Sequence, residues 1–272
     1  MMKRTTIISI GFTLVTVLTI ILMITHLIFN IPNAEKTLLG SKEKIELPAC
    51  TTIQFDYTTN AVKSKEPLYL LSDIAIMPDS TGTGNHLSAS PALLDKITTS
   101  VKGNVLTIHF DLSNPDLWKK YRSMYNINKR KKPLITIALA PEVMSLTNEQ
   151  IQTKHRVIYH VTNMKRAGFE IDLSKNNLIL ENSNFKQLTI ANPGEINLNK
   201  LTIHNMTLID NQTNEMQHLW DKDCVVDTLE IRNTNRLYMS NFAAPKHIRW
   251  IPLSDDASLD LKLKSNQTFE KL

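Results

Sequence analysis

Apolar and polar residues alternate in short runs over most of the chain, and this alternation predicts β-strands. After residue 46, clusters of Asn, Asp, Pro and Ser separate the runs, and these are turn-forming residues. Helical periodicity is scarce, with one short turn or helix expected around Pro91–Ile97. The pattern therefore predicts an all-β domain. Its first clear strands are Thr51–Tyr57, Leu68–Met77, Asn104–Leu112 and Pro133–Leu139.

The pattern becomes repetitive from about Phe169 onwards. Pentads of the form Leu, any residue, a large apolar residue, any residue, Asn begin at Leu178, Leu188, Leu201, Leu229 and Leu237. Each has the pattern of a short strand with its apolar residues on one face, closed by a turn residue. Leu188, Leu208, Leu229 and Ile248 also follow one another at intervals of 20, 21 and 19 residues. Periods of this length are typical of stacked repeats.

These repeats predict a parallel β-solenoid, or β-helix-like domain, in which each coil pairs with its neighbours. Equivalent Leu and Ile side chains would form an inner column, and Asn side chains at equivalent corners would form ladders. Asn is thickest between Asn176 and Asn241, whereas the chain has only 7 Gly, and Asn tolerates the left-handed conformation that tight turns need. An antiparallel sandwich with Asn-rich hairpins is the alternative.

The N-terminal residues predict a membrane anchor. Ile7–Ile31 is apolar almost without a break, and roughly 20 residues are enough to span a bilayer. Lys3 and Arg4 precede it, so the positive-inside bias places the N-terminus in the cytoplasm. A cleaved signal peptide is the alternative, but its apolar core is usually about 7–15 residues and ends at a small-residue site, which His26–Ala34 lacks. We expect an uncleaved signal-anchor in the inner membrane, with the C-terminal domain periplasmic or otherwise extracytoplasmic.

The expected organisation therefore has five parts, and 272 residues are enough to bury a proper core. One N-terminal transmembrane α-helix precedes the β-rich head. The parts are a cytoplasmic tail (1–6), the transmembrane helix (7–31), a linker (32–46), an N-terminal β-rich part of the head (47–168) and the Asn-rich solenoid coils (169–272).

With the strands placed, the run Asn85–Phe110 shows a further pattern. It contains Leu93-Leu94-Asp95, then Val101, Gly103 and Leu106-Thr107-Ile108. Together with Pro133–Val143 and the Asn-rich coils, this run resembles the bacterial candidate auto-transporter adhesins with a head GIN domain, over roughly Ile45 to the C-terminus. The resemblance implies a β-solenoid in the cell envelope, without catalytic residues. The chain departs from that family in its sparse Gly, in a basic insertion and in a helical anchor where many relatives carry a cleaved signal.

No catalytic, cofactor-binding or metal-binding site is predicted. The 8 histidines lack any metal-ligand spacing, and no nucleophile elbow or phosphate-binding loop occurs. Cys50 and Cys224 lie outside any C-x-x-C motif. We expect two free thiols, with a long-loop disulfide as the alternative in an oxidising compartment.

One segment has a composition that favours a ligand class. Trp118–Lys132 interleaves aromatic and basic side chains, and each basic residue near an anionic surface contributes about 1 kcal/mol. The alternative is a solvated insertion whose Trp118 and Tyr121 pack against the sheet. Nucleic acid is not an expected partner, because the topology places this segment outside the cytoplasm. The expected contacts with acidic glycan or lipid headgroups are Lys119, Lys120, Arg122, Lys129, Arg130, Lys131 and Lys132.

The sequence thus predicts a membrane-anchored, non-catalytic binding or scaffold protein that contacts envelope glycan, anionic lipid or a membrane protein. A structural or sensory subunit that pairs with another membrane protein is the second hypothesis. A β-helical carbohydrate-active enzyme is the least favoured, because it would need paired carboxylates. For that role the chain offers Asp255 and Asp256 with Glu195 or Asp210.

Overall fold

The computed structural model describes residues 15–25, 41–58, 74–111, 113, 133–149, 157–211, 218–220, 223–239, 245–261 and 268–272. The chain divides into two units, Met1–Gly40 and Ser41–Leu272. In the first unit, residues 15–25 form a helix. They belong to the predicted membrane-spanning segment, and the rest of that segment lies outside the described residues. In the described part of the chain, no helix is both long and apolar enough to cross a membrane.

The described residues of the second unit lie mostly in strands, which confirms the all-β prediction for them. Among these residues a single helical turn, α3 (Pro91–Leu94), interrupts the strands close to the predicted position. The strands are β1 (Glu43–Glu46), β2 (Thr52–Thr58), β3 (Ile74–Pro78), β4 (His86–Ala89), β5 (Ile97–Lys102), β6 (Val105–Asp111), β7 (Ile135–Leu139), β8 (Ser145–Asn148), β9 (Ile158–Thr162), β10 (Lys165–Asp172), β11 (Asn177–Ala191), β12 (Ile196–Asp210), β13 (His218–Trp220), β14 (Val225–Asn233), β15 (Arg236–Met239), β16 (His247–Pro252), β17 (Ser258–Leu261) and β18 (Thr268–Lys271).

The predicted strands can be compared with these bounds. Strands β2, β6 and β7 lie within about two residues of the predicted ones. Strand β3 covers the end of the predicted Leu68–Met77, and residues 68–73 lie outside the described residues. Strand β1 occupies the end of the segment expected to be a linker, where it pairs with β4.

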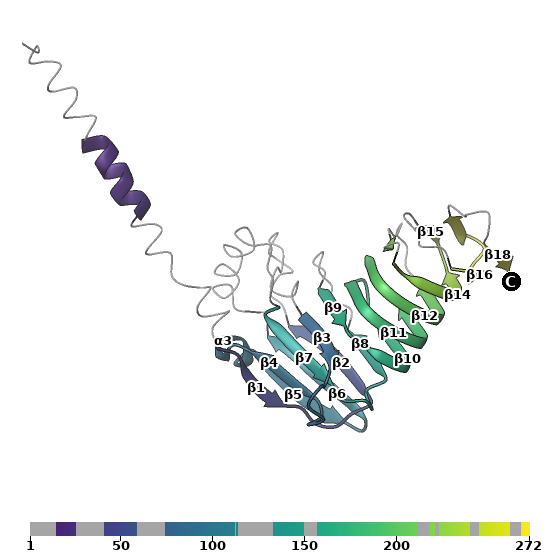
Figure 1. Cartoon of the computed structure of the whole chain (residues 1–272), viewed down its shortest axis with the longest axis horizontal. Helices are drawn as coiled ribbons and strands as arrows, with labels where there is room; N and C mark the ends of the chain where they lie inside the picture. Colours follow the sequence, from purple (N-terminus) through teal and green to yellow (C-terminus); the bar gives the residue numbers. More distant parts are fainter. Residues whose placement is uncertain are drawn as a thin grey trace, which may run out of the picture. The chain divides into compact units, whose positions relative to one another are not determined.

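The coils from β9 onwards stack in parallel. One stack runs β10, β11, β12, β14, β16, β18, and a second runs β9, β11, β12, β13, with β15 and β17 as a further parallel pair. Figure 1 shows these strands lying side by side towards the C-terminus. This is a β-solenoid, so the antiparallel sandwich is wrong for these coils. Among the described strands, antiparallel pairs are confined to β1 with β4, β4 with β7, and β5 with β6.

The first strands are interleaved rather than stacked in chain order. Strand β2 lies between β6 and β8, and β3 lies between β7 and β9, with parallel pairing throughout. The chain later passes through β6, β7, β8 and β9, and so it encloses two strands that precede it in the sequence. This interleaving brings together outward side chains that are far apart along the chain.

The inner column is built from Leu, Ile and Met side chains, but its register differs from the predicted one. Leu188 pairs with Met206 rather than with Leu208. Leu208 in turn pairs with Ile231 rather than with Leu229. All five side chains are buried. The intervals of 20 and 21 residues therefore do not connect paired positions, because alternate residues share a face and either apolar neighbour satisfies the pattern.

The predictions for the last interval, from Leu229 to Ile248, and for the turn-forming role of Asn are confirmed in part. Leu229 pairs with Ile248, which confirms that interval. Asn182 and Asn192 close their pentads with φ angles of 49° and 47°, so Asn does supply left-handed corners. Asn205, by contrast, lies within β12 and is exposed. The prediction that every pentad ends in a turn is therefore wrong, because the strand continues past that residue.

Candidate functional site

All seven basic residues predicted to contact an anionic surface lie outside the described residues. The structure nevertheless shows which strands precede and follow the segment that contains them. It follows β6, which ends at Asp111, and it precedes β7, which begins at Ile135. The predicted contact itself stays a prediction, and the residues remain Lys119, Lys120, Arg122, Lys129, Arg130, Lys131 and Lys132.

Three neighbouring strands end at the place where this segment leaves. Strands β6, β2 and β8 are adjacent and parallel, so their carboxyl ends meet at one edge. Each is followed by a connection outside the described residues, namely residues 59–73 after β2, 114–132 after β6 and 150–156 after β8. Binding residues concentrate on loops that a rigid scaffold holds in place. We therefore take these strand ends as the candidate site.

The outward side chains here form what we call the strand-end corner, which consists of Gln54, Asp56, Thr58, His109 and Glu149. The Nδ1 atom of His109 lies 2.6 Å from Oδ2 of Asp56. Because a carboxylate has no proton to give, Nδ1 donates this hydrogen bond, and Nε2 of the same ring lies 3.2 Å from the Thr58 hydroxyl. On the other side, Nε2 of Gln54 donates to Oε1 of Glu149 at 3.0 Å.

The two carboxylates of the corner have pKa values displaced in opposite directions. Burial tends to raise the pKa of Asp56, but hydrogen bonds from His109, the Tyr57 amide and Glu149 outweigh it and leave that pKa below its ordinary value. The pKa of Glu149 is raised, first by its hydrogen bond with Asp56 and then by the charge of that carboxylate. One of two neighbouring carboxyl groups thus holds a proton more readily than the other.

The inner face of the same strands carries a buried polar chain. The Tyr57 hydroxyl bonds to the Tyr159 hydroxyl, which donates to Oδ1 of Asn148. The Nδ2 group of Asn148 donates to the Asp172 carbonyl at 2.7 Å, and the ring of Phe55 stacks on Tyr159 with centroids 5.2 Å apart. These contacts hold β2, β8, β9 and β10 in place beneath the corner and make it rigid.

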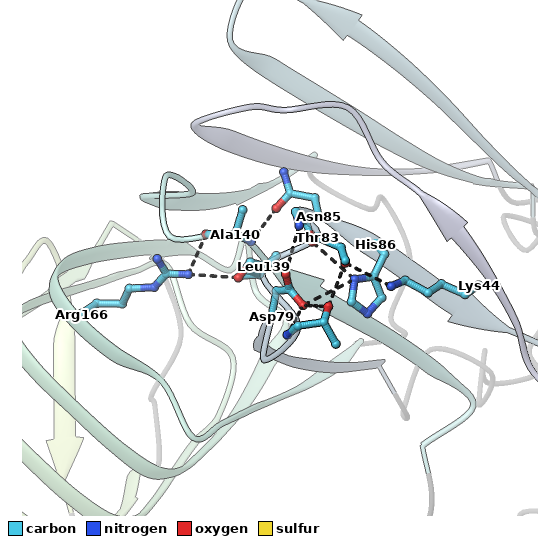
Figure 2. Close-up of polar contacts among 10 residues, drawn as sticks. Lys44, Asp79, Thr83, Asn85, His86, Leu139, Ala140 and Arg166 are labelled. Atoms are coloured by element: carbon cyan, nitrogen blue, oxygen red, sulfur yellow. Dashed lines mark hydrogen bonds and ion pairs between the residues drawn. The ribbon is translucent and has the colours of Figure 1, made fainter.

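A second polar cluster closes the ends of β3 and β7, as Figure 2 shows. The side chain of Asp79 is 1% exposed. It accepts hydrogen bonds from the Thr81 amide at 2.9 Å, the Thr81 hydroxyl at 2.6 Å and the Gly84 amide at 3.0 Å. The Thr81 hydroxyl, then the amides, hold the pKa of Asp79 well below its usual range. This carboxylate therefore closes the turn into β4.

Two side chains continue this cluster across the sheet (Figure 2). Asn85 is buried, and its Oδ1 accepts from the Ala140 amide at 2.8 Å. The guanidinium of Arg166 donates to the Ala140 carbonyl at 2.8 Å and also to the Pro141 carbonyl. Arg166 thus covers carbonyl groups beyond β7 that strand pairing leaves open. These contacts join strands, so we assign the cluster a structural role.

The remaining candidate chemistry does not assemble into a site. Asp210 is 1% exposed, so it is not available to a substrate. Cys50 and Cys224 are both buried, and burial is the main reason that the pKa of Cys50 is raised. Over the described ranges, no group of three His, Cys, Asp or Glu side chains is arranged to hold a metal ion.

No protein-family model and no curated protein matches this chain. Solved structures do resemble it. One is a candidate adhesin from Parabacteroides merdae, with a TM-score of 0.37 and 13% identity over 85% of this chain and 95% of that one. Another is a candidate lipid-binding protein from Parabacteroides distasonis, with a TM-score of 0.42 and 13% identity over 85% of this chain and 96% of that one. A candidate adhesin from Bacteroides fragilis gives a TM-score of 0.39 at 13% identity, with 85% and 96% covered. At such low values, the solenoid assignment rests on the strand pairing of this chain itself.

Proposed function

We propose that this chain is a non-catalytic, adhesin-like binding protein of the bacterial envelope. In this proposal a helix over Ile7–Ile31 anchors it in the inner membrane, and the unit Ser41–Leu272 lies on the periplasmic or extracytoplasmic side. The observation that carries the proposal is the meeting of the ends of β6, β2 and β8 on a rigid solenoid, each followed by a connection. Stacked coils present extended surfaces that suit binding to large partners.

The ligand class is proposed from the segment that follows β6. Its basic and aromatic residues, from Trp118 to Lys132, suit acidic glycan or anionic lipid headgroups. Attraction between exposed charges weakens in salt, since the Debye length falls from about 10 Å at 0.1 M to about 3 Å at 1 M. Binding to such a surface is therefore expected to fall steeply as salt rises.

The test measures binding of the full-length chain, in nonionic detergent, to an acidic polysaccharide and to neutral dextran. Replacing Lys129–Lys132 with Gln is expected to weaken binding to the acidic polymer at low salt. The melting temperature should stay nearly unchanged, because exposed charges contribute little to stability. The matched control replaces the four exposed residues Lys102, Lys165, Lys186 and Lys200 with Gln and should bind as the parent does. An unaltered affinity after the loop substitution would contradict this ligand assignment.

The anchor has its own test. A reporter that is active only outside the cytoplasm should work when it is fused after Leu272, and a cytoplasm-only reporter should not. The opposite result would contradict the proposed topology. Recovery of a cross-linked membrane protein without any polysaccharide binding would instead favour the role of a subunit in a membrane complex.

A further inference from the structure

Outward side chains join the three strand ends of the corner in addition to the backbone ladder. Asp56 of β2 accepts from His109 of β6, and Gln54 of β2 donates to Glu149, which follows β8. The Glu149 amide also donates to the Phe55 carbonyl at 2.9 Å. Each of the two neighbouring strand pairs therefore has a side-chain contact at its carboxyl end.

We propose that Asp56, His109 and Glu149 form a proton-controlled clamp, which tightens the strand-end corner in mild acid and loosens it as the pH approaches neutrality. The clamp would determine how firmly the ends of β2, β6 and β8, from which the three connections start, are held together. It does not depend on which ligand the protein binds, nor on the proposed function.

The chemistry of the clamp follows from one proton held between two carboxyl groups. Glu149 directly follows Asn148, which lies in register with Phe55, so Glu149 comes beside Asp56 on the neighbouring strand. With Asp56 ionised and Glu149 protonated, the pair carries one negative charge, and Asp56 accepts from Nδ1 of His109. Removing the proton leaves two neighbouring negative charges, which repel each other. A positive charge on His109 would add to the attraction for Asp56, and so it would act in the same direction as the proton on Glu149.

The direction with pH follows from the two displaced pKa values. The pKa of Glu149 lies above its ordinary value of 4.5 in the folded protein, so its contribution is present below 4.5 and is lost as the pH rises through the raised value. The pKa of Asp56 lies below its ordinary value of 3.8, so its contribution is present above 3.8 and is lost only in stronger acid. The clamp is therefore tightest between these two transitions.

The other charged groups around the pair belong to the neighbouring strands. Among the described residues, His109 is the charged or titratable neighbour that acts on both Asp56 and Glu149. Beyond it on β6, Asp111 is held ionised mainly by a hydrogen bond from the Ser113 hydroxyl, and to a smaller extent by the charges of Lys96 and His109. Asp111 has a lowered pKa, so it does not account for a transition above pH 4.5. Glu149 and His109 are then the groups to separate, and the Glu149→Gln variant separates them.

Hydrogen exchange of the full-length chain in nonionic detergent tests the clamp. Protection is measured by mass spectrometry for peptides that cover β2, β6 and β8, from mild acid to neutrality, after correction for intrinsic exchange. We expect protection to fall as the pH rises, while the remote strand β14 stays unchanged. The fall should be about tenfold for each pH unit by which the pKa of Glu149 in the closed corner exceeds that in the opened corner.

Three variants make the result decisive. Glu149→Gln still offers a donor to Asp56 but cannot ionise, so its protection should stay high at neutral pH. Asp56→Asn should also lose the pH response, because it removes the charge that displaces the pKa of Glu149. Gln54→Ala removes one hydrogen bond but keeps the pair, so it should retain the response. The same pH profile in the parent and in Glu149→Gln, or equal changes in β14, would overturn the proposal.

Discussion

The hydroxyl group of Tyr159 donates to Oδ1 of Asn148 inside the solenoid, and the hydroxyl group of Tyr57 lies against it. The Nδ2 group of Asn148 in turn donates a hydrogen bond to the carbonyl of Asp172. Four strands are thus linked by polar groups in a region that is otherwise apolar. Burial is the main cause of the raised pKa of both Tyr57 and Tyr159, so neither hydroxyl ionises while the coil is folded.

Removing the central hydroxyl should leave its partners unpaired. Tyr159→Phe keeps the ring but deprives both Tyr57 and Asn148 of a hydrogen bond. We expect it to lower the free energy of unfolding by about 1–3 kcal/mol, the usual cost of leaving a buried polar group unsatisfied. Tyr57→Phe should cost less, because Tyr159 still donates to Asn148. Denaturant unfolding at neutral pH measures both, and equal losses would contradict this arrangement.

The inner column gives a second prediction. Leu188, Ile203 and Ile231 are buried, and replacing any one of them with Ala should cost about 2–5 kcal/mol through lost contacts and a cavity. Thr202 is exposed on the opposite face of β12, so Thr202→Ala should change stability by less than about 0.5 kcal/mol. Chemical denaturation provides the comparison. Similar losses at Thr202 and Ile203 would show that this face of β12 is wrongly assigned.

Local pattern predicts part of this fold well. Alternation locates β2, β6 and β7, because one face of each strand is buried and the other is polar. The same period of two leaves the register open, since Met206 and Leu208 both suit the inner column and only their pairing distinguishes them. The corners at Asn182 and Asn192 were predictable, because Asn accepts a left-handed conformation more readily than most residues.

The strand-end corner could not be predicted in the same way. His109 and Asp56 are 53 residues apart in sequence, and Gln54 and Glu149 are 95 apart. Alternation does place Gln54, Asp56 and His109 on outward faces. It carries no signal that β2 lies between β6 and β8, because the choice of strand neighbours is decided by the tertiary structure. The sequence therefore indicates which of these side chains face outward, but not the order of the strands that brings them together.

The turn at Asp79 gives a prediction with a defined pH dependence. Its folded-state pKa is lowered from 3.8, so its stabilising contribution is present above that value and is lost as the pH falls through the lower folded value. Asp79→Asn should therefore destabilise the protein at neutral pH, because its amide group would face the donors that now bind the carboxylate. The difference from the parent should shrink in acid. Asp255→Asn, at an exposed turn, is the control and should show neither effect in denaturation at the two pH values.

The last coil makes a prediction about association. Strand β18 pairs with β16, and within the described part of the chain its other edge has no neighbouring strand. Phe269 of this strand is 43% exposed, although it continues the buried inner column. Lys271 points inward in register with Trp250, and its Nζ atom lies 4.6 Å from the centroid of that ring. Inward charges on short edge strands oppose further strand pairing.

Two substitutions at Lys271 separate these roles. Lys271→Ala removes the cation–π contact with Trp250 and should cost about 0.5–1 kcal/mol. Lys271→Leu instead continues the apolar column to the open edge, which favours addition of a strand from another molecule. We expect the Leu variant to self-associate most strongly as concentration rises, as followed by light scattering in nonionic detergent. The Ala variant, which also lacks the inward charge, should self-associate more than the parent and less than the Leu variant. A Leu variant that stays at the size of the parent over that range would mean that Lys271 does not protect this edge.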